Sequence, residues 1–256
     1  MLPIDRQVVL DVLETELGAR RIKDYCPNGL QVEGRPGISK VITGVTASQK
    51  LLDVAVAANA DLVLVHHGYF WKGEADIITG MKKRRLQTLL KHDINLVAYH
   101  LPLDIHPTLG NNAQLGQLLQ LQQLRAIPTA EPLGVLMQGD CAQPISAADF
   151  AERISQQLGR QVLLHESKAA SAQIRTVAWC SGGGQGYLPQ AAAAGADLFF
   201  SGEVSEQTIH QADELGIHFI AAGHHATERY GIKALGEWLA MTTGLTVEFV
   251  DLDNPA

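Results

Sequence analysis

Two histidine doublets are the most chemically suggestive feature of this 256-residue sequence, which contains ten histidines in all. The doublets are His66-His67 and His224-His225, and each follows a short apolar run. Imidazole is the commonest metal-binding side chain in proteins and the one that most readily exchanges a proton near neutral pH. The pattern therefore indicates metal binding or acid–base chemistry at the ends of two predicted strands.

The second doublet lies next to a carboxylate at helical spacing. His224 and Glu228 are four residues apart, at the start of a segment running to Trp238 that is predicted to be a helix. Side chains at positions i and i+4 of a helix lie on one face, about one turn apart. A histidine and a carboxylate in this arrangement can hold one metal ion, and His225 would then point elsewhere.

A third set of candidate ligands follows the predicted strand 95–99 and contains His100 and Asp104. An aspartate after a strand usually caps a turn or a helix, and His100 could either pack in the core or support a metal ligand. Three such sets at matching positions favour metal binding over these separate structural roles. The other histidines are expected to be structural or exposed: His92, His106, His165, His210 and His218.

Alternating strands and helices must position these residues. In the first half of the chain the predicted strands are 40–45, 61–65 and 95–99, and predicted helices lie between them at 49–58 and 81–92. This alternation indicates right-handed βαβ units and a parallel sheet. Sites in parallel sheets form at the carboxyl ends of the strands, which is where the candidate ligands lie.

The second half of the chain repeats this plan. Residues 194–200 closely resemble residues 58–64, and each segment has an aspartate immediately before an apolar strand. In this alignment Glu203 occupies the position of His67, so Glu203 is a candidate general base or a carboxylate that supports a ligand. We therefore expect an α/β protein made of two related units.

These units are expected to be interlinked, with largely parallel sheets and the metal site in the cleft between them. We place the first unit at residues 1–126 and the second at residues 127–256, with the C-terminal segment as a candidate to return to the first unit. The region 127–168, which contains several prolines and glycines, is the expected junction.

Composition excludes several classes of protein. Apolar residues make up 46% and charged residues 18%, which supports a sizeable core and argues against disorder. The net charge of −7 argues against nucleic-acid binding through phosphate contacts. No apolar stretch approaches the roughly 20 residues of a membrane-spanning helix, and the N-terminal segment lacks the features of a signal peptide. Three scattered cysteines make a reducing cytoplasm the expected compartment.

Five segments carry motifs that are informative in combination. They are VITGVTAS (41–48), VHHGYFWKG (65–73), HLPLDIHPTLGNN (100–112), SGEVSEQ (201–207) and GHHATERYG (223–231). Together they resemble the GTP cyclohydrolase 1 type 2 homolog family, the NGG-interacting-factor-like proteins with a dinuclear metal centre. The resemblance spans almost the whole chain, in order, and is to the short bacterial members that lack a large inserted domain.

The resemblance implies five ligands for two neighbouring divalent metal ions. Carried over motif by motif, they are His66, His67, Asp104, His224 and Glu228. The resemblance also implies that copies of the chain assemble into a toroidal homohexamer. The activity in the family name is a hydrolysis that opens a purine ring and releases its C8 as formate.

Mixed imidazole and carboxylate ligands suit zinc, iron, manganese or nickel. Five protein ligands shared by two ions leave positions for water, and a bound metal lowers the pKa of that water to near 7. Our leading hypothesis is therefore a metal-dependent hydrolase that acts on a nucleotide or another small molecule. The alternative is a metal-binding, regulatory or interaction protein without catalysis.

Other residues could position a substrate. The loop Ser181–Gly184 could bind an anion through its backbone N–H groups or simply form a tight turn. Tyr69 and Trp71 could stack on a base or pack in the core. Arg229 could meet a phosphate or form an exposed ion pair.

Overall fold

The computed structural model describes residues 2–256, which form two compact units. Unit 1 comprises the residues up to Leu103 together with Ile232–Asp253, and unit 2 comprises Asp104–Gly231 and Asn254–Ala256. The sequence placed the division after residue 126, whereas the compact units divide after Leu103. The chain passes between the units more than once, so the units are interlinked in sequence.

Unit 1 is built on a five-stranded sheet with the strand order β13-β4-β5-β6-β2. Its strands are β2 (Gly29–Val32), β4 (Lys40–Thr46), β5 (Leu62–His67), β6 (Asn95–Ala98) and β13 (Thr246–Phe249). All neighbouring strands pair in parallel except β2, which is antiparallel to β6. A short antiparallel pair, β1 (Ile4–Asp5) and β3 (Gly37–Ile38), lies outside this sheet. Strands β4 and β5 are buried almost throughout, as expected where both faces of a parallel sheet are covered.

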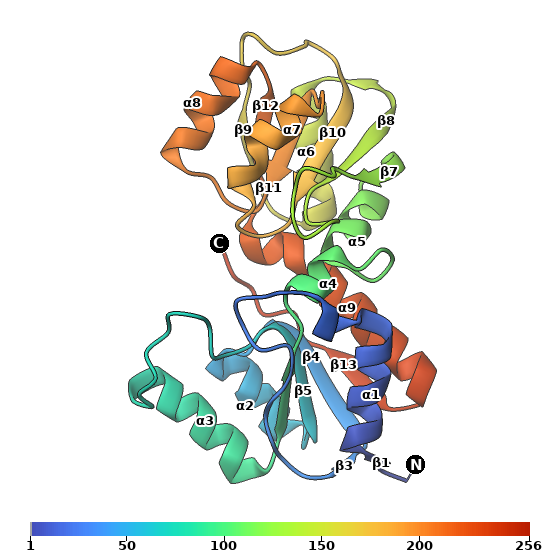
Figure 1. The fold of residues 1–256 in the computed structure, drawn as a ribbon, viewed down its shortest axis with the longest axis vertical. Helices are drawn as coiled ribbons and strands as arrows, with labels where there is room; N and C mark the ends of the chain where they lie inside the picture. The colour runs from blue at the N-terminus through green and yellow to red at the C-terminus, as the bar shows by residue number, and fades with distance from the viewer. Residues whose placement is uncertain (1) are drawn as a thin grey trace. The chain divides into compact units, whose positions relative to one another are not determined.

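Helices cover both faces of the unit 1 sheet (Figure 1). On one face, α2 (Gln49–Ala57) and α3 (Gly80–His92) contribute leucines to a core with β4, β5 and β6. On the other face lie α1 (Arg6–Leu17) and the C-terminal part of α9 (His224–Thr243). Helix α9 approaches β4 closely at Gly236, because a Cβ atom there would lie 3.0 Å from Thr43 Cγ2.

Unit 2 contains a six-stranded sheet with the order β7-β8-β10-β11-β12-β9. Its strands are β7 (Gln122–Ala126), β8 (Met137–Ile145), β9 (Leu163–His165), β10 (Ile174–Cys180), β11 (Leu198–Ser201) and β12 (His218–Ala221). The three central strands β10, β11 and β12 are parallel, and the outer strands are antiparallel.

Two separate apolar cores lie on the two faces of the unit 2 sheet. Helices α5 (Asn111–Leu118) and α6 (Ala147–Leu158) contribute to the core around Trp179 and Phe200. Helices α7 (Leu188–Ala193) and α8 (Glu206–Leu215) contribute to the core around Phe199 and Phe219. The short helix α4 (Leu101–Ile105) and the 3-10 turns η1 (Ala19–Arg21) and η2 (Gln185–Tyr187) complete the chain.

The internal repeat is visible at two aspartates. Asp61, before β5, accepts hydrogen bonds from the backbone N–H groups of residues 39 and 40 at 2.8 and 2.9 Å. Asp197, before β11, accepts from the backbone N–H groups of residues 175 and 176 at 2.8 and 3.0 Å. Each carboxylate therefore joins the start of one parallel strand to the start of the next. The strand sets β4-β5-β6-β2 and β10-β11-β12-β9 follow one plan.

The mixed α/β class with largely parallel sheets, expected from the sequence, is thus confirmed. Among residues 2–256, no helix has both the length and the apolar character needed to span a bilayer.

Candidate metal centre

Three histidines converge in unit 1. His66 and His67 end β5, and His100 follows the neighbouring parallel strand β6. The ring centroids of His66 and His67 are 4.5 Å apart, and that of His100 lies 5.1 Å from the first and 5.7 Å from the second. One ring nitrogen of each lies within 4.8 Å of the other two. Adjacent carboxyl ends of parallel strands thus produce a cluster of imidazoles.

The unit 1 imidazoles are held through Nδ1. His66 is fully buried, and its Nδ1 lies 3.0 Å from the main-chain carbonyl oxygen of Tyr99. A carbonyl oxygen can only accept, so Nδ1 carries the proton and Nε2 carries the lone pair that could bind a metal. Nδ1 of His67 lies 3.3 Å from the hydroxyl of Thr46 on β4.

His100 is oriented by a carboxylate from the loop before β2. Its Nδ1 lies 3.0 Å from Asp24 Oδ1, and the other oxygen of Asp24 accepts from Leu101 N and Asn28 Nδ2. Burial alone would raise the pKa of Asp24, but the hydrogen bonds from His100 and Asn28 lower it to about 2. Asp24 was not expected from the sequence, because no local pattern in this turn-rich loop distinguishes it.

Unit 2 brings three of the expected ligands together. His224 and Glu228 lie in the first turns of α9, with His224 Nε2 3.2 Å from Glu228 Oε2. A carboxylate oxygen of Asp104, on α4, lies within 4.8 Å of one of Glu228. Both carboxylates are buried, with exposed fractions of 6% and 3%. Two buried carboxylates at this distance repel each other unless a cation or a proton lies near them.

Glu203 supports His224 from the other side of the ring. Its Oε1 accepts a hydrogen bond from His224 Nδ1 at 2.6 Å. Burial alone would lower the pKa of His224, but the contacts with Glu228 and Glu203 raise it to about 9. A carboxylate on Nδ1 fixes the orientation of an imidazole and strengthens Nε2 as a ligand. The structure therefore places Glu203 in contact with His224, a candidate ligand.

The glycine-rich loop after β10 packs directly against the unit 2 set. Gly182 has φ +57, in the left-handed region that favours glycine, and a Cβ there would collide with Glu228 Oε1 and lie 3.0 Å from His224 Nε2. Ser181 Oγ donates to Asp104 Oδ1 at 2.9 Å. The backbone N–H groups of Ser181 and Gly182 donate to Asn112 Oδ1 and Thr227 Oγ1. These two N–H groups already have acceptors, so they are not available to cradle an anion.

The three side chains that could have positioned a substrate, Tyr69, Trp71 and Arg229, make contacts within the protein. The Tyr69 hydroxyl is buried and donates to the carbonyl oxygen of Ala47 at 2.7 Å. Trp71 packs edge-on against His100, with ring centroids 4.9 Å apart. Arg229 donates to a main-chain carbonyl and lies over the ring of Tyr230.

Cys180, at the end of β10, lies near the unit 2 carboxylates but differs from them in charge. Burial raises the pKa of its thiol well above the ordinary value, and Asp104 and Glu228 raise it further. A metal-binding cysteine must be a thiolate. Cys180 also belongs to none of the groups of possible metal ligands that the described residues form, and those of unit 2 supply imidazole and carboxylate.

These features define an α/β protein with clusters of histidine and carboxylate side chains of the kind that can bind a metal ion. The model of the Duf34/NIF3 (NGG1p interacting factor 3) family matches residues 4–255, and the chain belongs to this family. The resemblance found in the five motifs is thereby confirmed.

Named relatives and solved structures agree with this assignment. The chain is 58% identical to the "GTP cyclohydrolase 1 type 2 homolog" of Yersinia pestis, over 98% of this chain and 100% of the relative. It is similar to the solved structure described as "protein ybgI, unknown function", with a TM-score of 0.95 and 50% identity over 99% of this chain and 100% of the other. The structure of TTHA1606 from Thermus thermophilus has a TM-score of 0.89 and 36% identity over the same shares of the two chains.

Proposed function

We propose that the protein binds two divalent metal ions through His66, His67, Asp104, His224 and Glu228, and that it is a metal-dependent hydrolase. The observation that carries the proposal is the buried carboxylate pair of unit 2, Asp104 and Glu228, beside an imidazole whose Nδ1 is held by Glu203. Such a group of anions and oriented lone pairs is suited to a divalent cation.

The residues fit this class of metal in their chemistry. Unit 1 supplies imidazoles, and the carbonyl oxygen of Tyr99 orients the ring of His66 through Nδ1. Unit 2 supplies two carboxylates and His224. Imidazole with carboxylate suits zinc, iron, manganese or nickel, and Cys180 is in none of the candidate ligand groups of the described residues.

A bound divalent metal would supply a water molecule that is acidic enough to act as a nucleophile near neutral pH. The chain's own residues then have positioning roles. Glu203 holds the ring of His224 and Ser181 holds a carboxylate oxygen of Asp104. The name of the Yersinia relative supports a nucleotide such as GTP as the first substrate to test, with formate as the product to measure. The family resemblance also supports a toroidal hexamer of this chain, and the three scattered cysteines support a cytoplasmic location.

Metal content tests the ligand set directly. Wild-type protein purified without a chelator or a histidine tag should contain about two metal ions per chain, measured by plasma mass spectrometry. His224→Ala should lose metal, whereas His225→Ala, which changes the adjacent histidine outside the set, should retain it. Substoichiometric metal that is unchanged in His224→Ala would overturn the assignment.

Turnover separates the hydrolase from a protein that only binds metal. In an enzyme, Glu228→Ala should abolish formate release from GTP while the chain stays folded. In a protein whose metal is structural, the same change should lower the melting temperature sharply, because metal-binding energy is then folding energy.

A further inference from the structure

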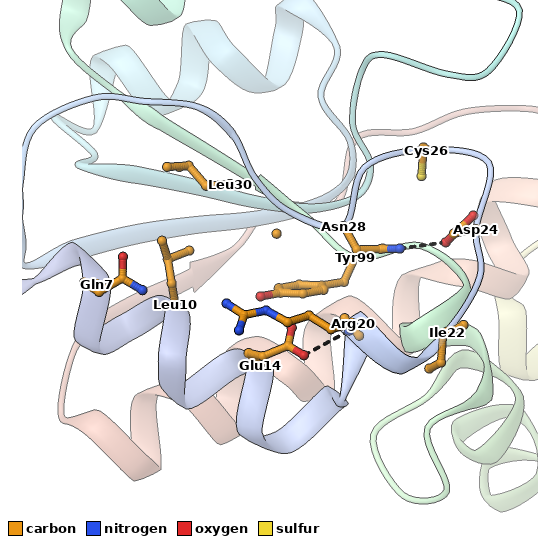
Figure 2. A pocket seen from close by; sticks show the side chains of 12 residues that line it. Gln7, Leu10, Glu14, Arg20, Ile22, Asp24, Cys26, Asn28, Leu30 and Tyr99 are labelled. Atoms are coloured by element: carbon orange, nitrogen blue, oxygen red, sulfur yellow. Dashed lines mark hydrogen bonds between the residues drawn. The ribbon is translucent and has the colours of Figure 1, made fainter.

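Unit 1 contains a pocket of about 450 Å³ that none of the five proposed metal ligands lines. It is bounded by α1, the turn η1, the loop that follows η1, the start of β2 and Tyr99 (Figure 2). Part of its wall is apolar and is formed by Leu10, Ile22 and Leu30. Its volume is within the range of small-molecule sites.

Tyr99 lines this pocket and can donate a hydrogen bond into it. Its side chain is 1% exposed, and among residues 2–256 its hydroxyl has no hydrogen-bond partner. Figure 2 shows the phenol ring lying in the pocket between Leu10 and Asn28. Burial raises the pKa of Tyr99, and the Glu14 carboxylate raises it further, so the hydroxyl keeps its proton and can donate. The Tyr99 hydroxyl is not among the described polar atoms that are buried without a partner, so it is open to the pocket and can donate to an acceptor atom there.

Two opposite charges line the same pocket. The guanidinium of Arg20 extends toward the hydroxyl end of the Tyr99 ring in Figure 2. Within the described part of the chain this guanidinium makes no hydrogen bond or ion pair. The Glu14 carboxylate accepts a hydrogen bond from the backbone N–H of Arg20 at 2.9 Å but does not pair with the guanidinium. The pocket thus presents a cation and a neutral donor beside an anion.

Two other polar residues of the wall, Asn28 and Asp24, are already engaged. Asn28 donates to Asp24 at 3.0 Å and accepts from the backbone N–H of His100 at 2.8 Å. Asp24 has hydrogen bonds on both oxygens. These residues close the wall, which leaves Tyr99, Arg20 and Glu14 to recognise a ligand.

We propose that this pocket binds a small zwitterion of the α-amino-acid type with an aliphatic side chain. The ligand carboxylate accepts from the Arg20 guanidinium and the Tyr99 hydroxyl, and the ammonium group contacts Glu14. The aliphatic side chain lies against the apolar wall at Leu10 and Leu30. Hydrogen bonds between charged groups are the strong ones in such sites, so both charged ends of the ligand contribute to affinity.

Calorimetric titration of the full-length protein with L-leucine tests the ligand class. The matched probes are isoamylamine, which lacks the carboxylate, and isocaproate, which lacks the ammonium group. L-Leucine should bind saturably, and each probe should bind at least about 10-fold more weakly because one charged contact is missing. Valine, isoleucine and methionine complete the aliphatic series. Absence of saturable binding by every member of the series would overturn the proposal.

Variants locate the binding to this pocket. Arg20→Gln should weaken L-leucine binding by about 10-fold or more, and Tyr99→Phe by about 5- to 10-fold. Arg21→Gln, which changes the adjacent exposed arginine of the same turn, should bind as wild type does. Equal affinity of wild type and Arg20→Gln would contradict the assignment.

Melting temperature and metal content are measured on the same variants, so that a loss of leucine binding can be told apart from unfolding or loss of metal. Tyr99→Phe removes a hydroxyl that has no hydrogen-bond partner among the described residues, so its melting temperature should stay close to that of wild type. A clear drop would show that the hydroxyl is satisfied within the protein and would count against the site. Metal content, measured on the same samples, reports on the proposed function separately from leucine binding.

Discussion

The two units share a strand plan but differ in the chemistry at equivalent positions. His67 ends β5 in unit 1, and Glu203 stands at the matching place after β11 in unit 2. The imidazole lies in a cluster of three histidines, whereas the carboxylate holds the ring of His224. The shared scaffold fixes where a side chain emerges, and the residue type decides whether it can bind a metal or can orient a residue that does.

The units also differ in charge. The unit 1 set consists of imidazoles, of which His66 and His100 donate through Nδ1 to fixed acceptors. The unit 2 set contains two buried carboxylates and His224, whose pKa of about 9 makes it an imidazolium at neutral pH in the metal-free protein. Unit 2 therefore depends more on compensating charge, and the loop at Gly182 packs directly against its charged side chains.

The largest expected effect lies in that loop. Gly182→Ala places a Cβ against Glu228 and His224 at a positive φ, so it should lower the free energy of unfolding by about 3 kcal/mol. Gly186→Ala, where a Cβ would meet nothing within 4 Å, is the control and should stay close to wild type. Urea denaturation measures both. Similar stabilities of the two variants would show that the unit 2 set is not tightly enclosed.

In unit 1 the corresponding test changes Asp24, the carboxylate that contacts His100. The pKa of Asp24 is about 2 in the folded protein against an ordinary 3.8, so ionised Asp24 stabilises the fold at pH values above 3.8. Asp24→Asn should lower the free energy of unfolding at pH 7 by about 2 kcal/mol. The stabilisation is lost as the pH falls toward 2, so the gap between wild type and variant should shrink between pH 4 and pH 2. Denaturation at several pH values measures this gap.

Asp76→Asn is the control for this experiment, because Asp76 is exposed. It should remain within about 0.5 kcal/mol of wild type at every pH. A gap for Asp24→Asn that stays constant as the pH falls would contradict the low pKa of Asp24.

A smaller effect, on metal affinity, is expected for the groups that contact Nδ1 of a histidine in each unit. Glu203 Oε1 lies 2.6 Å from Nδ1 of His224, whereas Thr46 Oγ1 lies 3.3 Å from Nδ1 of His67. Glu203→Gln should therefore weaken metal binding by about 10-fold, and Thr46→Val by only about 2-fold. Competition with a chromogenic chelator measures both affinities. The reverse order would show that the neutral hydroxyl contributes more than the carboxylate.

The smallest effect concerns the repeated aspartates. Asp61→Asn and Asp197→Asn each weaken two hydrogen bonds to backbone N–H groups, and each should cost about 1 kcal/mol. Asp61 has an additional contact with Arg35 at 3.1 Å, so its variant should be less stable by a few tenths of a kcal/mol more. Thermal unfolding of both variants checks this. A large difference in stability between the two variants would show that the two aspartates are not equivalent.

Much of the fold was predictable because its signals are local. Apolar runs such as 61–65 and 95–99 predicted β5 and β6 nearly in full, and the matching aspartates at 61 and 197 indicated the repeat. The unit boundary was not predictable in the same way. Strand β7 pairs antiparallel with β8 in the unit 2 sheet, although it precedes the expected boundary at residue 126. The proline-containing region 127–168, where the junction was expected, contains strands β8 and β9 of that sheet and the helix α6.

For the candidate site, the sequence by itself determined which side chains could bind a metal, because ligand type and i, i+4 spacing are local properties. These properties marked the two histidine doublets, Glu228 and the pair His100 and Asp104 as candidates, and the family resemblance implied the set His66, His67, Asp104, His224 and Glu228. The tertiary structure alone decided what orients them. Asp24 meets His100 across 76 residues, and Ser181 meets Asp104 across 77. Contacts at such separations exist only after strands align at one edge of a sheet, and no periodicity in the sequence encodes them.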